Sequence, residues 1–162
     1  MGEKLKSVVG LKVAVLASLD DEGSIKQAAE LKEQLAEDKV NVVVVGERVA
    51  EGVDMAYTAA GAFAFDGVVV AQGAEKLFDA KNKSPLYPTG RPAQVLDEAY
   101  RWGKPVAALG SADKVYESTS VEDGPGVYTA KDTAEVVKNM KEGLTQFRFA
   151  ERFPMDEETE SE

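Results

Sequence analysis

Short apolar runs alternate with amphipathic stretches along most of the chain. The apolar runs are rich in Val and Ala, as buried strands of parallel sheets are, and they cover residues 11–17, 40–45, 66–71, 104–110 and 126–130. Strands that alternate with helices pair in parallel, with the helices packed on both faces. The pattern therefore predicts an α/β fold: a flavodoxin-like, doubly wound parallel sheet of five strands.

The first helix has a start signal and an apolar face. Ser24 and Gln27 have the spacing of a capping box, which predicts that the helix begins at Ser24. Ile25, Ala28, Leu31 and Leu35 follow at helical spacing. This face is expected to pack on the sheet.

Further helices are predicted after the second, third and fourth strands and at the end of the fold. The sequence indicates short helices at 54–60 and 112–118 and a longer one at 92–102. Asp132 and Glu135 can cap a closing helix that runs through Phe147. The irregular stretch at 81–91 holds Leu86 and Tyr87 between prolines, and loops of this kind are often functional.

Composition and charge limit the partners of the protein. The 162 residues carry a formal net charge of -10, which repels nucleic acid and anionic membranes. The absence of Cys excludes disulfides and thiol chemistry and leaves the compartment open. We expect one domain at 10–153, a flexible lead-in at 1–9 and a disordered acidic tail at 154–162.

Candidate chemistry is sought at the carboxyl ends of the strands, where α/β folds bind ligands. Ser111 follows the fourth strand, but a serine nucleophile needs a base and the chain has no His, so a helix N-cap is the expected role. Glu75 follows the third strand and is a candidate general base if desolvated. We expect it instead to interact with the N-terminus of the helix that it begins.

The acidic cluster Asp20–Glu22 follows the first strand. Three carboxylates would repel the phosphate of a flavin, which disfavours flavin or small-ligand binding. A Mg²⁺ site would also need an aspartate after the third strand, where the chain has Gln72 and Gly73. The cluster is expected to be a solvated loop, without a metal or cofactor.

Several segments together resemble a known family. They are Gly10–Ser18, Phe65–Ala71, Leu86–Pro92, Gly103–Ser111 and Phe147–Phe153, and the Leu-Tyr-Pro-x-Gly-Arg-Pro loop is the most specific of them. They look like the C-terminal domain of fungal large-subunit catalases. That domain is similar in fold to the class I glutamine amidotransferase-like superfamily, which includes the PfpI-type proteases and carries a nucleophilic Cys where this chain has Gly110.

The resemblance implies a non-enzymatic accessory domain. Peroxide decomposition and haem would belong to the catalase core of the parent homotetramer, on which this domain packs and which it stabilises. It further implies a holdase-type chaperone for unfolding client proteins when the domain is isolated, and an extracellular or cytoplasmic location. Candidate interaction residues are Leu86, Tyr87, Phe149 and Phe153; the last two belong to a segment that either anchors the closing helix or binds a partner. The alternatives are a degenerate hydrolase of the amidotransferase-like class, using Ser111 or Glu75, and a small-ligand-binding domain.

Overall fold

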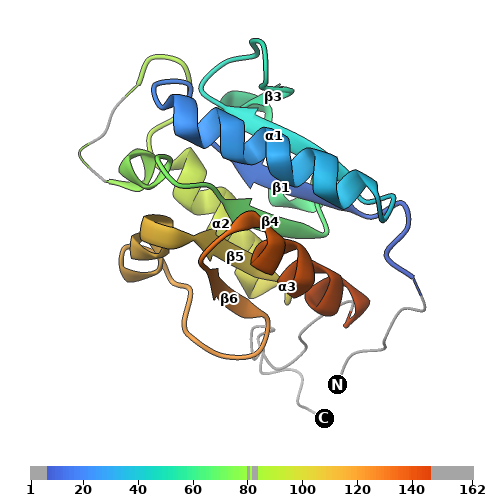
Figure 1. The fold of residues 1–162 in the computed structure, drawn as a ribbon. Coiled ribbons are helices and arrows are strands. Elements are labelled where there is room, and N and C mark those ends of the chain that lie inside the picture. The colour runs from blue at the N-terminus through green and yellow to red at the C-terminus, as the bar shows by residue number, and fades with distance from the viewer. Residues whose placement is uncertain (1–6, 80, 82–83, 147–162) are drawn as a thin grey trace.

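The computed structural model describes residues 7–79, 81 and 84–146, which form a parallel sheet between two layers of helices (Figure 1). Within these residues six strands pair in parallel in the order β3-β2-β1-β4-β5-β6. Their bounds are Lys12–Leu16 (β1), Asn41–Gly46 (β2), Met55–Ala56 (β3), Gly67–Val70 (β4), Val106–Leu109 (β5) and Val127–Ala130 (β6). The order confirms the predicted flavodoxin-like sheet and adds a short edge strand to it.

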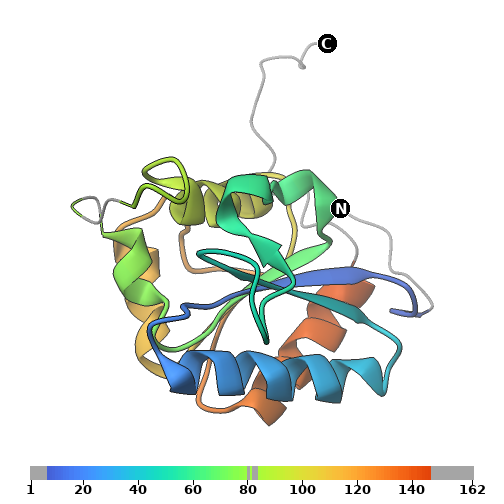
Figure 2. The same cartoon turned by 90° about the horizontal axis from the view of Figure 1, so that it is seen from above.

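Helices cover both faces of this sheet, as predicted. The α-helices are Glu22–Ala36 (α1), Arg91–Arg101 (α2) and Thr133–Thr145 (α3), and short 3₁₀ helices cover Tyr57–Ala59, Ala62–Ala64, Glu75–Phe78 and Gly110–Glu117. Figure 2 shows α1 and α3 on one face and α2 on the other. Because all strands run the same way, the sheet has one carboxyl edge and one amino edge.

Alternation along the strands divides the core between the two faces. Val13 and Val15 of β1 face α1 and α3, whereas Ala14 and Leu16 face the side of α2. All four side chains are fully buried. Two buried faces explain why the strands are continuous apolar runs instead of alternating apolar and polar residues.

The predicted start of α1 is wrong. Asp21 is the N-cap, and its Oδ1 accepts a hydrogen bond from the Ser24 N–H at 3.1 Å. Ser24 lies in the first turn, where its buried Oγ accepts from the Ser18 N–H at 3.0 Å. The Asp21 carboxylate therefore caps the helix, and Ser24 links the first turn of α1 to the segment that follows β1.

The predicted helix at 54–60 is also wrong, because the chain there forms β3 and a 3₁₀ turn. Val45 pairs with Met55, and the carboxylate of Asp54 accepts the Val44 N–H at 3.0 Å. Pairing with β2 satisfies backbone groups at the sheet edge that a helix would leave unpaired. This short strand makes the sixth of the sheet.

The start of the closing helix is confirmed. Oδ1 of Asp132 accepts the Glu135 N–H at 2.9 Å, and Oε1 of Glu135 accepts the Lys131 N–H at 2.8 Å. The helix ends at Thr145. The segment at 147–153, with Phe149 and Phe153, and the acidic tail at 154–162 lie outside the described residues.

Candidate functional site at the carboxyl edge

The turn after β5 begins with a glycine in a left-handed backbone conformation. Gly110 has φ +52°, in the left-handed region that disfavours residues with a side chain. The chain continues directly into the 3₁₀ helix Gly110–Glu117, so the residues after the turn lie at the carboxyl edge of the sheet. Gly110 itself supplies no chemical group there.

The side chain of Gln72 fills the space beside Gly110. A Cβ built on Gly110 would lie 2.5 Å from Nε2 and 2.7 Å from Cδ of Gln72. Two hydrogen bonds join Gln72 to Gln27 of α1: the Gln72 backbone N–H donates to Oε1 of Gln27 at 2.8 Å, and Nε2 of Gln27 donates to Oε1 of Gln72 at 3.0 Å. The Gln72 amide thus fills the space into which a side chain at position 110 would project.

The two candidate catalytic residues lie next to each other. Ser111 Oγ donates to Oε2 of Glu75 at 3.1 Å and lies 3.5 Å from Nε2 of Gln72. The other oxygen of Glu75 accepts the Gly73 N–H at 2.7 Å. The predicted N-cap role of Ser111 is wrong, because the 3₁₀ helix begins at Gly110 with Leu109 before it and has no side-chain cap.

This arrangement resembles part of a serine hydrolase site. A hydroxyl and a carboxylate are in contact, but serine catalysis uses a neighbouring base, commonly imidazole, to take the hydroxyl proton. The sequence contains no His. Because both Glu75 oxygens accept hydrogen bonds from neighbours, this carboxylate holds the turn after β4 against the turn after β5.

The acidic cluster after β1 serves the start of α1. Asp21 caps the helix, and Asp20 lies exposed with Oδ2 4.0 Å from Nζ of Lys76. In the described part of the chain, no group of three or more His, Cys, Asp or Glu side chains could hold a metal ion. No helix in that part is long and apolar enough to span a bilayer.

The proline-rich loop places its two apolar residues differently. The Tyr87 ring is buried and packs at 5.2 Å between centroids on Tyr57, whereas the Leu86 side chain is half-exposed. Tyr57 OH donates to the Ala17 carbonyl at 2.8 Å, and burial raises the pKa of Tyr57 well above its usual value. Of the predicted interaction residues, Leu86 is therefore the one in the described chain with a solvent-accessible side chain; Phe149 and Phe153 lie outside it.

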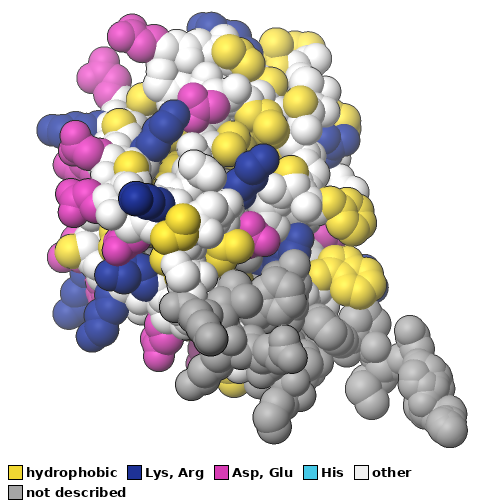
Figure 3. Space-filling model, turned by 90° about the vertical axis from the view of Figure 1, so that its right-hand side faces the viewer, with side chains coloured by type: hydrophobic (Ala, Val, Ile, Leu, Met, Phe, Trp, Pro, Cys, Tyr) yellow, Lys and Arg dark blue, Asp and Glu magenta, His cyan; other side chains and the backbone are white. Residues whose placement is uncertain are grey.

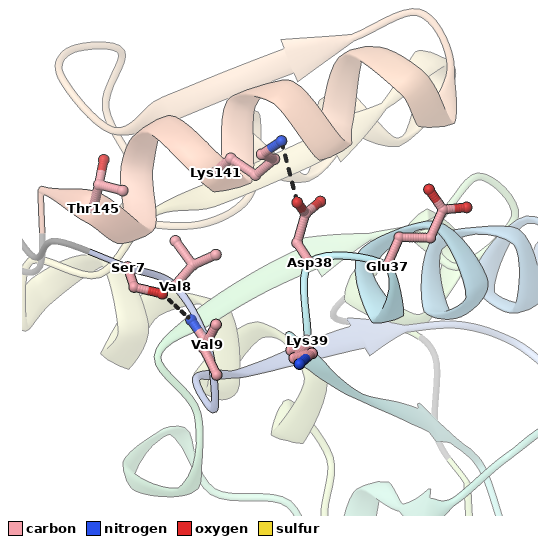
Figure 4. Close-up of a pocket in the computed structure, with 8 residues that line it drawn as sticks. All are labelled: Ser7, Val8, Val9, Glu37, Asp38, Lys39, Lys141 and Thr145. Atoms are coloured by element: carbon pink, nitrogen blue, oxygen red, sulfur yellow. Dashed lines mark hydrogen bonds and ion pairs between the residues drawn. The ribbon is translucent and has the colours of Figure 1, made fainter.

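A hollow lies away from these residues, beside the segment that leads into β1 (Figure 4). It has a volume of about 440 Å³ and is lined by Ser7–Val9, the turn after α1, and α3. Lys141 Nζ pairs with Oδ1 of Asp38 at 3.3 Å across it. This ion pair is internal to the protein and points to no particular ligand for the hollow.

Sequence reasoning missed the contact of Gln27 with Gln72. Gln72 lies in the turn after β4, at the carboxyl edge where α/β folds bind ligands, but Gln27 is 45 residues away in sequence. A polar residue directly after a buried strand signals a possible role at the sheet edge. Nothing in the local pattern indicates its partner.

Comparison with known proteins identifies relatives over nearly the whole chain. Residues 9–154 match the family described as the C-terminal domain found in long catalases. Catalase-3 of Neurospora crassa is 49% identical over 160 residues, covering 98% of this chain and 22% of the relative. Catalase B of Emericella nidulans is 48% identical over 161 residues, with 96% of this chain and 22% of the relative covered. A catalase of Blumeria hordei is 44% identical over 157 residues, with 96% and 22% covered.

These relatives are fungal catalases, and the chain spans about a fifth of their length, 22%. The matched family has a place in the longer proteins, at the C-terminal end. Identity of this level over almost the entire chain also agrees with the resemblance of its motifs. The chain belongs to the family of C-terminal domains found in long catalases.

Proposed function

We propose that this chain is a non-enzymatic domain of a long catalase, which packs on the catalase core and stabilises the parent tetramer. When isolated, the domain acts as a holdase for unfolding proteins. The observation that best supports a non-enzymatic domain is the turn after β5. There Gly110 offers no nucleophile, and the Gln72 amide fills the adjacent space. A site of this kind supports a structural use of the fold in preference to a catalytic one.

Haem in the proposed parent would be bound outside this chain. Catalases hold haem iron with a Tyr ligand. In the described chain, the Tyr57 hydroxyl is buried against the Ala17 carbonyl and the Tyr116 hydroxyl donates to the Tyr128 carbonyl at 2.8 Å. These two hydroxyls are not placed as iron ligands, and we assign haem binding and peroxide decomposition to the core.

The holdase part is tested with the isolated chain. Light scattering of a heat-aggregating client enzyme is followed with the chain or with an inert protein of equal net charge. Exposed apolar side chains can bind clients while the charge of -10 keeps the complexes soluble, so we expect suppression beyond the charge control. Suppression equal to that of the control would contradict the chaperone role.

A second candidate function follows from the contact between Ser111 and Glu75. The 3.1 Å hydrogen bond favours a degenerate hydrolase of the amidotransferase-like class over a ligand-binding domain. Hydrolysis of an activated ester by the chain is compared with that by Ser111→Ala and Glu75→Gln variants. If the domain has only a structural function, the unmodified chain and both variants should hydrolyse the ester at the same background rate. A rate above background that both variants abolish would support the hydrolase and contradict our assignment.

A further inference from the structure

Exposed hydrophobic side chains of the described chain gather at the two edges of the sheet. Val49, 65% exposed, and Leu86, 46% exposed, follow β2 and β4 and belong to the carboxyl edge. Val9, Phe63 and Trp102 are 59%, 85% and 45% exposed and lie shortly before β1, β4 and β5. Phe63 is the most exposed of these side chains, and exposed apolar side chains that lie together mark interaction surfaces.

The last three residues belong to one edge. The strands β1, β4 and β5 are neighbours in the sheet and run in parallel, so their preceding segments meet at the amino edge. We call Val9, Phe63 and Trp102 the amino-edge patch. Figure 3 looks at this side of the molecule and shows more hydrophobic side chains toward one flank and more charged ones toward the other, with both kinds between them.

The segments that carry the amino-edge patch contain almost no charge. Residues 7–11 and 61–65 have no ionisable side chain, and residues 102–105 have only Lys104, which is 5% exposed. Charged residues make up 30% of the whole chain. After the same three strands, by contrast, the carboxyl edge carries charged residues of both signs: Asp20, Asp21, Glu75, Lys76, Asp113 and Lys114.

The surroundings of the patch resemble the rim of an interface. Lys12, at the start of β1, and Arg101, at the end of α2, are exposed and flank it. Asp66 accepts the Lys12 backbone N–H at 2.8 Å between these segments. Aromatic side chains with charged residues around them, as at Phe63 and Trp102, match the composition of protein interfaces.

We propose that the amino-edge patch is the surface that packs on the catalase core of the parent protein. This inference rests on the proposed function and specifies its contact surface. It differs from the loop at Leu86, which lies at the opposite edge. Burial of Phe63 and Trp102 against the core would supply the hydrophobic contribution to docking.

The direction of the chain favours the core as the occupant of this surface. The family lies at the C-terminal end of long catalases, and this chain covers 22% of such relatives, so most of a parent chain would precede it. The polypeptide enters the fold through residues 7–11, which belong to the amino edge. Covalent connection thus brings the preceding part of the parent to the amino-edge patch.

Hydrogen exchange of backbone amides tests the proposal. The isolated chain is compared with a long catalase that carries it, and peptides covering 7–11, 61–66 and 100–105 are followed. We expect exchange in these peptides to slow at least about tenfold in the long protein, equivalent to about 1.4 kcal/mol of added protection. Peptides around Val49 and Leu86 serve as the matched control and should exchange equally in both proteins.

Other outcomes separate this inference from the function on which it rests. Protection of the Val49 and Leu86 peptides without the amino-edge peptides would overturn the patch and leave docking on the core intact. Equal exchange of every peptide in the two proteins would overturn docking itself. Amino-edge protection that grows with the concentration of the isolated chain would assign the surface to a second copy and overturn the core as occupant.

Charge substitutions provide an independent readout. Phe63→Asp and Trp102→Asp in the long catalase should increase the rate at which limited proteolysis releases this domain, whereas Val49→Asp and Leu86→Asp should leave that rate unchanged. Urea unfolding of the four isolated variants excludes misfolding as the cause. Equal release by both pairs of variants would contradict the proposal.

Discussion

The amide of Gln72 lies where a side chain on Gly110 would project, with Nε2 2.5 Å from the Cβ position. This relationship joins the turns after β4 and β5, and Gln27 of α1 fixes it through two hydrogen bonds. The backbone of Gly110 has a positive φ. A glycine therefore suits both the left-handed backbone at this turn and the space that the Gln72 amide occupies.

Gly110→Ala should destabilise the isolated chain. The left-handed backbone and the contact with Gln72 together are expected to lower the free energy of unfolding by about 1–3 kcal/mol, measured by urea denaturation. In the double variant with Gln72→Ala, the part of the lost unfolding free energy that is due to the contact with Gln72 should be recovered. The part that is due to backbone strain should remain. Gly61→Ala is the control, because nothing lies within 4 Å of the added Cβ; equal stability of Gly110→Ala and this control would contradict the assigned crowding.

Asp21→Ala should weaken the start of α1. Loss of the hydrogen bond to the Ser24 N–H is expected to lower the free energy of unfolding by about 0.5–2 kcal/mol, whereas Asp21→Asn should retain most of it. Asp20→Ala is the matched control, because the side chain of Asp20 is 79% exposed and 4.0 Å from Lys76. An equal loss in Asp20→Ala would show that general charge, not capping, stabilises this turn.

Tyr57→Phe should both destabilise the fold and change its response to alkaline pH. The buried Ala17 carbonyl loses its donor, which is expected to cost about 1–3 kcal/mol of unfolding free energy at neutral pH. Burial raises the Tyr57 pKa, so the unfolded chain loses this proton first and stability falls as pH rises above the usual value of about 10. Urea denaturation across this range should show a shallower fall for Tyr57→Phe; parallel curves would contradict the prediction.

Asp54→Asn should reduce the loss of stability in acid. Burial opposes ionisation of Asp54, but the Lys32 hydrogen bond, the Val44 N–H and the Lys32 charge together hold its pKa below the usual value. A lowered pKa gives stability that is present above the usual value of about 4 and is lost as pH falls through the folded-state value. Unfolding followed between neutral pH and pH 2 should therefore depend less on pH in Asp54→Asn, and an unchanged slope would count against this role.

Much of the fold could be predicted from local pattern. The five apolar runs became strands within a few residues of their predicted bounds, because strands buried on both faces need continuous apolar sequence. A helix was wrongly predicted at 54–60 because Met and Ala favour helices, whereas pairing with β2 determined the structure of this segment. The start of α1 was missed because Asp21, three residues before Ser24, was read as part of a solvated loop although aspartate suits an N-cap.

The candidate site was predictable in its location but not in its contacts. Gly110, Ser111 and Glu75 were all expected at the carboxyl edge, and the parallel sheet brings them there. The contact of Ser111 with Glu75 joins residues 36 positions apart, and that of Gln27 with Gln72 joins residues 45 apart. Such pairs depend on strand order and on side-chain conformation, which periodicity does not encode.

The most direct test of the central claim is heat inactivation of a long catalase with and without this domain. Catalase activity and tetramer content are measured together after incubation over a range of temperatures. We predict equal activity before heating and a lower midpoint for loss of both activity and tetramer when the domain is removed. Unchanged midpoints, or a loss of activity before heating despite an intact tetramer, would contradict a non-enzymatic domain that stabilises its parent.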